Sequence, residues 1–153
     1  MTALCALDAV TADIRDHRIT VDGTGLYNVV RHLDLLCHLT AHLAADAEYQ
    51  LALNIRELPP ARILGASASH IGQAVAHYTQ ALAPLIALTS TAQDTLEKKL
   101  DALGHHSCLR IHLDGADRAL AAARTALEVR QPVPAASASA PALRHDSTVR
   151  RRA

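Results

Sequence analysis

The chain has 153 residues, of which half are hydrophobic, and it carries no net charge when its ten histidines are neutral. This length favours one compact domain, and no apolar run reaches the roughly 18 residues that a membrane span needs. There is also no basic start followed by an apolar segment, so we expect a soluble, cytoplasmic protein and exclude membrane and secreted classes.

Large aromatic side chains are nearly absent, because the chain has three tyrosines and no tryptophan or phenylalanine. A core without large rings must be filled by Leu, Ile, Val and Ala, which suit close helix packing better than a sheet sandwich. Cys5, Cys37 and Cys108 are odd in number and widely spaced, which argues against a disulfide framework. The composition therefore predicts an all-α protein with reduced, mostly buried thiols.

The first two predicted helices are separated by a glycine turn. Residues 2–18 place apolar side chains every three or four positions, which is the spacing of one helix face. Residues 20–25 contain two glycines and Asp22, and they predict a turn. A second helix is expected from about residue 24 to Leu58, because two prolines follow and a residue before proline avoids helical dihedrals.

The second predicted helix has more apolar surface than a single neighbouring helix can cover. Its apolar arc extends over well more than half of the circumference. We therefore interpret this helix as either central in a bundle or part of an assembly surface. Four leucines form the predicted surplus that a monomer leaves uncovered: Leu35, Leu39, Leu43 and Leu53.

The third predicted helix has the most regular apolar pattern in the chain. Its apolar residues form a narrow stripe from Ile71 to Leu103, which is typical of a helix with a long partner. Pro84 lies inside the stripe and predicts a possible kink, whereas Ser90 with Gln93 could form a capping box that starts a new helix. Because the stripe keeps its phase through both signals, we favour one kinked helix over residues 60–103 above two helices.

Two glycines give further boundaries around this third helix. Residues 61–69, which include Gly65, are expected to be irregular, and Gly104 is expected to stop the helix. A fourth helix should then run from about His105 to Arg130. We predict the second and third helices to be longer than the first and fourth, so that part of the long central hairpin lacks cover.

Short connections make successive helices antiparallel neighbours, so the sequence predicts an up-down four-helix bundle. The bundle domain is expected to span residues 1–131. Residues 132–153 are rich in Ala, Ser, Pro and Arg and offer little apolar surface to bury, which predicts a disordered basic tail.

Histidine and cysteine spacing gives one candidate zinc site. His105, Cys108 and His112 would project from one edge of the fourth helix at a zinc-compatible spacing, with a further ligand needed from elsewhere. The competing interpretation is that these histidines cap the helix and that the Cys108 thiol is buried. His38 and His42 also lie one turn apart, but both fall opposite the apolar arc and lack the intervening glutamate of the zinc-protease pattern.

Patterns of nucleophilic or phosphate-dependent catalysis are missing from the sequence. There is no Gly-x-Ser-x-Gly elbow and no Gly-x-x-x-x-Gly-Lys loop. Cys37 precedes His38, but adjacent helix residues point about 100° apart, and Cys37 falls on the predicted core side. The sequence therefore does not indicate an enzyme.

We interpret the chain as a non-enzymatic helical assembly or interaction module, whose partner is itself, as a dimer, or another helical protein. A metal-binding bundle that uses His105, Cys108 and His112 is the first alternative. The second is a DNA-associated factor that acts through Arg144 and residues 150–152, although four charges in a flexible tail give only weak, salt-sensitive phosphate contact. Nucleic acid and membrane are therefore not the expected partners.

Overall fold

The structure is a computed structural model that describes residues 2–53, 55, 58–90 and 95–128. These residues form four helices and no strand, which confirms the all-α prediction. The predicted tail over residues 132–153 lies outside the described residues. The helices are α1 (Ala3–Asp16), α2 (Gly23–Leu53), α3 (Ala61–Ser90) and α4 (Leu96–Glu128).

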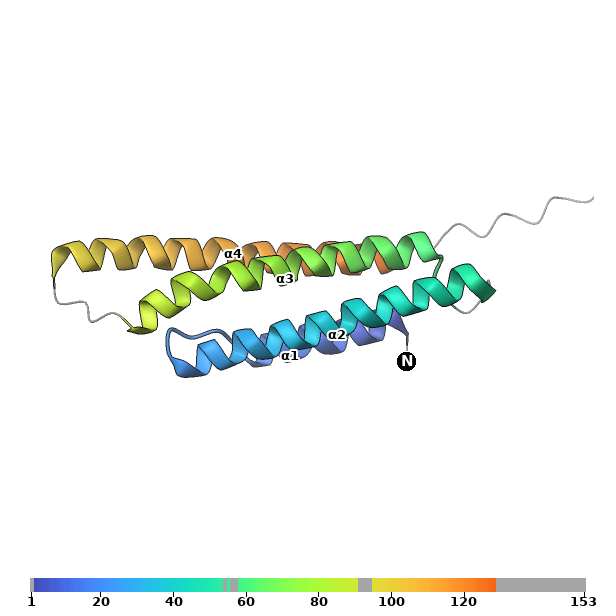
Figure 1. Ribbon diagram of the computed structural model, residues 1–153, viewed down its shortest axis with the longest axis horizontal. Helices are drawn as coiled ribbons and strands as arrows, with labels where there is room; N and C mark the ends of the chain where they lie inside the picture. The colour runs from blue at the N-terminus through green and yellow to red at the C-terminus, as the bar shows by residue number, and fades with distance from the viewer. Residues whose placement is uncertain (1, 54, 56–57, 91–94, 129–153) are drawn as a thin grey trace, which may run out of the picture.

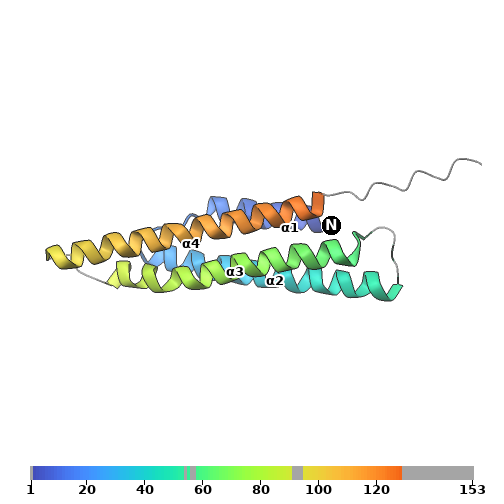
Figure 2. The ribbon, with the colours of Figure 1, turned by 90° about the horizontal axis from the view of Figure 1, so that it is seen from above.

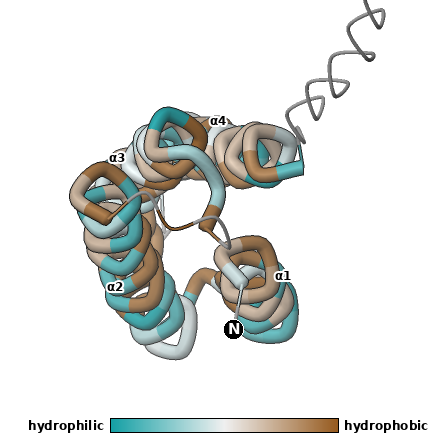
Figure 3. The backbone as a smooth tube through the Cα atoms, turned by 90° about the vertical axis from the view of Figure 1, so that its right-hand side faces the viewer, coloured by the Kyte–Doolittle hydropathy of each residue, from teal (hydrophilic) through white to brown (hydrophobic). Residues whose placement is uncertain are grey.

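The helices pack as an up-down bundle, as the sequence predicts (Figure 1). Along the bundle axis, α3 lies beside both α2 and α4, and α1 completes the bundle beside α2 and α4 (Figure 3). α1 has 14 residues and α4 has 33, which correspond to lengths of about 21 and 50 Å at 1.5 Å per residue. α1 can therefore cover only part of α4.

The core consists of small and aliphatic side chains. α2 contributes Val29 and Leu36, and α3 contributes Leu64 and Ile71, all fully buried. Burying one such side chain is worth roughly 1.5–3 kcal/mol. α4 presents buried alanines to α3, and the Ser67 hydroxyl donates to a carbonyl oxygen of α4 at 3.2 Å. These small residues allow α3 and α4 to pack closely along their length.

Polar bonds fix the turn between α1 and α2. The Asp22 carboxylate accepts hydrogen bonds from the Thr20 hydroxyl at 2.7 Å and the Gly25 backbone N–H at 2.9 Å. The buried Asn28 amide donates to the Arg18 carbonyl oxygen at 2.9 Å. Gly25 also lies against the Thr20 backbone with no room for a side chain. The residues that follow α1 are therefore held in place against α2.

The prediction of one kinked helix over residues 60–103 is wrong. α3 ends at Ser90, and α4 begins at Leu96 and runs back along α3. Thr95 caps the new helix, because its hydroxyl accepts from the Lys98 backbone N–H at 3.3 Å and thus satisfies one of the donors that a helix start leaves free. The apolar residues before and after the break therefore belong to two separate helices.

Other predicted boundaries need smaller corrections. Gly104 lies inside α4 and does not stop a helix, and residues 61–69 are helical. α2 ends at Leu53, and α3 continues through the buried Pro84. The fourth helix is as long as the second and third, so α1 is the short one among the described helices. No described helix is long and apolar enough to cross a membrane.

Candidate functional site

The four leucines predicted as surplus lie in different environments. Leu39 and Leu43 are 5% and 0% exposed, so the prediction that a monomer leaves them uncovered is wrong. They belong to the face of α2 that joins the common core. Leu35 is half-buried, and Leu53 is 65% exposed. Of this predicted set, Leu53 alone is a surface residue.

A different set of leucines, on α4, is exposed. Leu96, Leu100 and Leu103 have 76%, 61% and 65% of their surface accessible. Their spacing of four and three residues places them on one face of α4, which we call the α4 stripe. At about 100° per residue, this face is opposite the one that buries Leu109 and Leu120.

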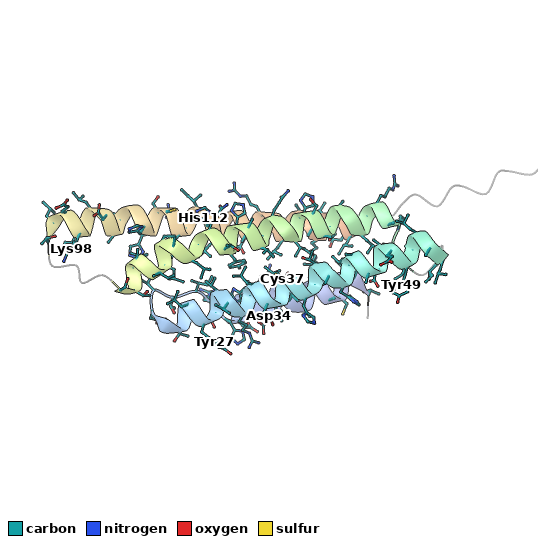
Figure 4. All side chains as sticks on the ribbon, viewed as in Figure 1. Tyr27, Asp34, Cys37, Tyr49, Lys98 and His112 are labelled. Atoms are coloured by element: carbon teal, nitrogen blue, oxygen red, sulfur yellow. The ribbon has the colours of Figure 1, made fainter. Side chains whose placement is uncertain are left out.

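The α4 stripe lies on a part of the helix that extends past the end of α3 (Figures 1 and 2). Lys98 marks this part in Figure 4. The cover that α1 gives lies much further along α4, where the Arg124 guanidinium and the Asp8 carboxylate are 3.1 Å apart. The three leucines therefore present apolar surface on the order of several hundred Å² at one end of the bundle.

A second feature is a pocket between the helices, whose lining includes the buried side chains of His32 and Tyr78. The two side chains are 1% and 3% exposed, and their rings meet edge to face with centroids 5.3 Å apart. Neither ring nitrogen of His32 forms a hydrogen bond with a described side chain, and the backbone of His17 lies close enough to act on the imidazole. The imidazole is therefore enclosed by protein atoms on all sides.

Charged side chains line the more accessible part of the same pocket. The pocket measures about 360 Å³, and its exposed lining residues are Arg15, Arg18 and Asp117. Ile14, Ile19 and Leu113 supply apolar walls. Asp22, Gly25 and Asn28 hold the turn between α1 and α2 in place. This turn therefore positions Arg18 and Ile19 of the lining.

Burial sets the charge states of this pocket. It lowers the pKa of His32, which the Asp13 carboxylate only partly opposes, so the imidazole is neutral at pH 7. Burial also raises the pKa of the Tyr78 hydroxyl, with a contribution from Asp117, and keeps it protonated. The pKa of Asp117 is raised by burial and by the nearby Asp114, whereas Arg15 opposes this shift.

We expect the free energy of unfolding to fall as the pH drops below 6.5. The unfolded chain then protonates His32 with its ordinary pKa of about 6.5, while the folded chain, whose His32 pKa is lowered, does not. The loss from this one proton is at most about 1.4 kcal/mol per pH unit. Urea unfolding of the wild type and His32→Leu at several pH values measures it: the wild type should lose more stability than the variant, and equal losses would contradict this origin.

The burial of His32 was not predicted, although its spacing from buried residues is a signal in the sequence. His32 follows Val29 by three residues and precedes Leu36 by four, and both neighbours are fully buried. This spacing places the imidazole on the buried face of α2. The predicted core side of α2 was centred elsewhere because it also contained Cys37, which is exposed.

The predicted zinc ligands do not form a metal centre. His105 and Cys108 are exposed on α4, and His112 is half-buried with its ring centroid 5.9 Å from that of His77 on α3 (Figure 4 shows the place of His112). Among the described residues, no three His, Cys, Asp or Glu side chains form a group that could hold a metal ion. We therefore do not propose zinc binding here.

The cysteines also differ from their prediction. Cys5, Cys37 and Cys108 are unpaired and exposed, so the expectation of mostly buried thiols, and of Cys37 on the core side, is wrong. Cys37 belongs to the wide apolar arc that the sequence predicts for α2. Packing buries only a narrower face of this helix, and Cys37 lies outside that face. His38 and His42 are exposed, as predicted.

Comparisons of the chain with protein-family models, with curated proteins and with solved structures find no significant match. The α4 stripe and the pocket at His32 are therefore interpreted from their own chemistry.

Proposed function

We propose that this protein is a non-enzymatic helical assembly module that forms a weak, two-fold symmetric dimer through the α4 stripe. The supporting observation is that Leu96, Leu100 and Leu103 are each more than 60% exposed on one face of a projecting helix end. Soluble monomers rarely expose contiguous apolar patches of several hundred Å² unless these bind something.

A second copy of the chain fits this surface. Spacings of four and three residues form the seam along which two helices pack, and a two-fold axis pairs the stripe with itself. The polar residues of the same segment are Glu97, Lys98, Lys99 and Asp101, which sum to zero charge, so two copies approach without net repulsion.

The size of the stripe sets the expected affinity. Stable interfaces bury roughly 800 Å² on each partner, which exceeds what three leucines present. The dimer should therefore be reversible, with dissociation in the micromolar range or weaker.

The exposed apolar residues at the C-terminal end of α2 are less suited to pairing than the α4 stripe. Tyr49, Leu51 and Leu53 are exposed at 58%, 78% and 65%. Residues two apart on a helix point about 200° away from each other, so Leu51 does not share a face with the other two. This group therefore serves as a control for the α4 stripe.

The same proposal places the protein in a reducing compartment such as the cytoplasm. Three exposed, unpaired thiols support this, because an oxidising compartment would cross-link or modify them.

Light scattering over a range of concentrations tests the dimer. The wild type should rise from the monomer mass of 16.3 kDa toward twice that value, whereas the double variant Leu100→Glu/Leu103→Glu should stay monomeric. The matched control Leu51→Glu/Leu53→Glu should behave as the wild type, and circular dichroism should show unchanged helix content in both. A wild type that is monomeric at every concentration, or a control that also loses the dimer, would refute the proposal.

A further inference from the structure

The face of α4 that carries the α4 stripe changes its chemistry further along the helix. At about 100° per residue, the stripe is followed on the same face by Ser107, Arg110 and Asp114, all of which are exposed. The apolar part of this face therefore lies only at the N-terminal end of α4, and a charged part follows it directly. This order restricts how two copies of the helix can pair.

A parallel pair of α4 helices is disfavoured by the charged part of the face. Two helices that run in the same direction continue to face each other past the stripe, so Arg110 and Asp114 of both copies would lie in the contact. Removing charged groups from water is costly unless each gains a well-placed partner. Parallel pairing also sets two helix starts side by side, each equivalent to about half a positive charge.

An antiparallel pair confines the contact to the stripe. Because the helix of the second copy begins at Leu96, the contact ends where this residue meets the first copy. When Leu100 of each copy packs against Leu103 of the other, Leu96 lies opposite Ser107. Arg110 and Asp114 are then beyond the end of the second helix and stay in water.

We infer that the dimer is antiparallel, with Leu100 of one copy against Leu103 of the other and with the two-fold axis perpendicular to α4. The inference rests on the proposed dimer and adds its orientation and register. α3 packs on the opposite face of α4, which buries Leu109 and Leu120, so the bundles leave the contact free. They extend from it in opposite directions and make an elongated dimer.

Disulfide trapping between two full-length variants tests the orientation. Both variants carry serine in place of the exposed Cys5, Cys37 and Cys108. One adds Leu96→Cys and the other adds Ser107→Cys. A disulfide needs Cα atoms within about 7 Å. In the antiparallel pair the two copies of residue 96 are 11 positions apart, which is about 16 Å along the helix, and so are the two copies of residue 107.

We expect diamide oxidation of the mixed variants to give at least tenfold more disulfide-linked dimer than oxidation of either variant alone. Leu53→Cys mixed with Ser107→Cys, in the same background, is the control and should give no more than either variant alone. Light scattering before oxidation shows whether each sample is dimeric.

The possible failures are distinguishable. Linkage of each variant to itself would show a parallel dimer, which overturns this inference and leaves the proposed dimer intact. Dimers in solution without any linkage would place the contact on another surface, and samples that are monomeric at every concentration would refute the dimer itself. Equal linkage in the control would show random collision and also overturn the inference.

Discussion

Leu43→Ala is expected to lower the free energy of unfolding by about 2–5 kcal/mol. Leu43 is fully buried and belongs to the common core, so truncation removes its buried surface and leaves a cavity among side chains that relax only in part. Equilibrium unfolding in urea, followed by circular dichroism, measures the change.

Leu53→Ala is the matched control, because it makes the same chemical change at an exposed position of the same helix. Its unfolding free energy should differ from that of the wild type by no more than about 0.5 kcal/mol. The comparison also tests the correction to the sequence prediction: if Leu43 were an uncovered interface residue, its truncation would change the mass in solution and leave the stability of the monomer unchanged.

Gly25→Ala is expected to destabilise the protein by about 1–3 kcal/mol or more. A Cβ at this position would collide with the Thr20 carbonyl oxygen, and this neighbour is backbone that cannot rotate away. The turn between α1 and α2 must therefore shift, and with it the bonds to Asp22 and Asn28 that hold it. Thermal and urea unfolding measure the loss.

Gly23→Ala provides the control in the same turn of α2. A Cβ there meets no atom within 4 Å, so the variant should be as stable as the wild type or slightly more stable, because alanine loses less backbone entropy on folding. Equal destabilisation by both substitutions would show that the close approach of Thr20 to Gly25 is not what limits the turn.

The sequence predicted the helical class and the antiparallel order because both follow from local signals. The glycine turn near Asp22 and the prolines after Leu58 break the helical pattern at well-defined places. In the structure α1 ends at Asp16 and α2 ends at Leu53, each a few residues before the predicted break. The third boundary was missed because Thr95 is an ordinary residue whose capping role depends on the backbone of Lys98. The apolar stripe from Ile71 to Leu103 continues with the same spacing across this break by coincidence, and it therefore favoured the wrong prediction of one helix.

The candidate sites were less predictable because they depend on which apolar residues find neighbours. α2 offers more apolar surface than α3 and α1 cover, and only packing decides that Leu39 is enclosed while Val30 is left outside. Leu96 and Leu100 looked like core residues of the third helix, but the chain reversal places them on the exposed face of α4. The pocket combines residues from all four helices, which no sequence spacing brings together.

Self-association through α4 is tested most directly by intermolecular NOEs between leucine methyl groups. An equimolar mixture of chains with carbon-13-labelled leucine methyls and unlabelled chains, measured at a concentration where light scattering shows the dimer, restricts the signals to contacts between copies. We predict NOEs from the Leu96, Leu100 and Leu103 methyl groups of one copy to α4 of the other. A dimer whose intermolecular NOEs come from Leu51 and Leu53 instead, or a sample without any from α4, would contradict the proposed role of this helix.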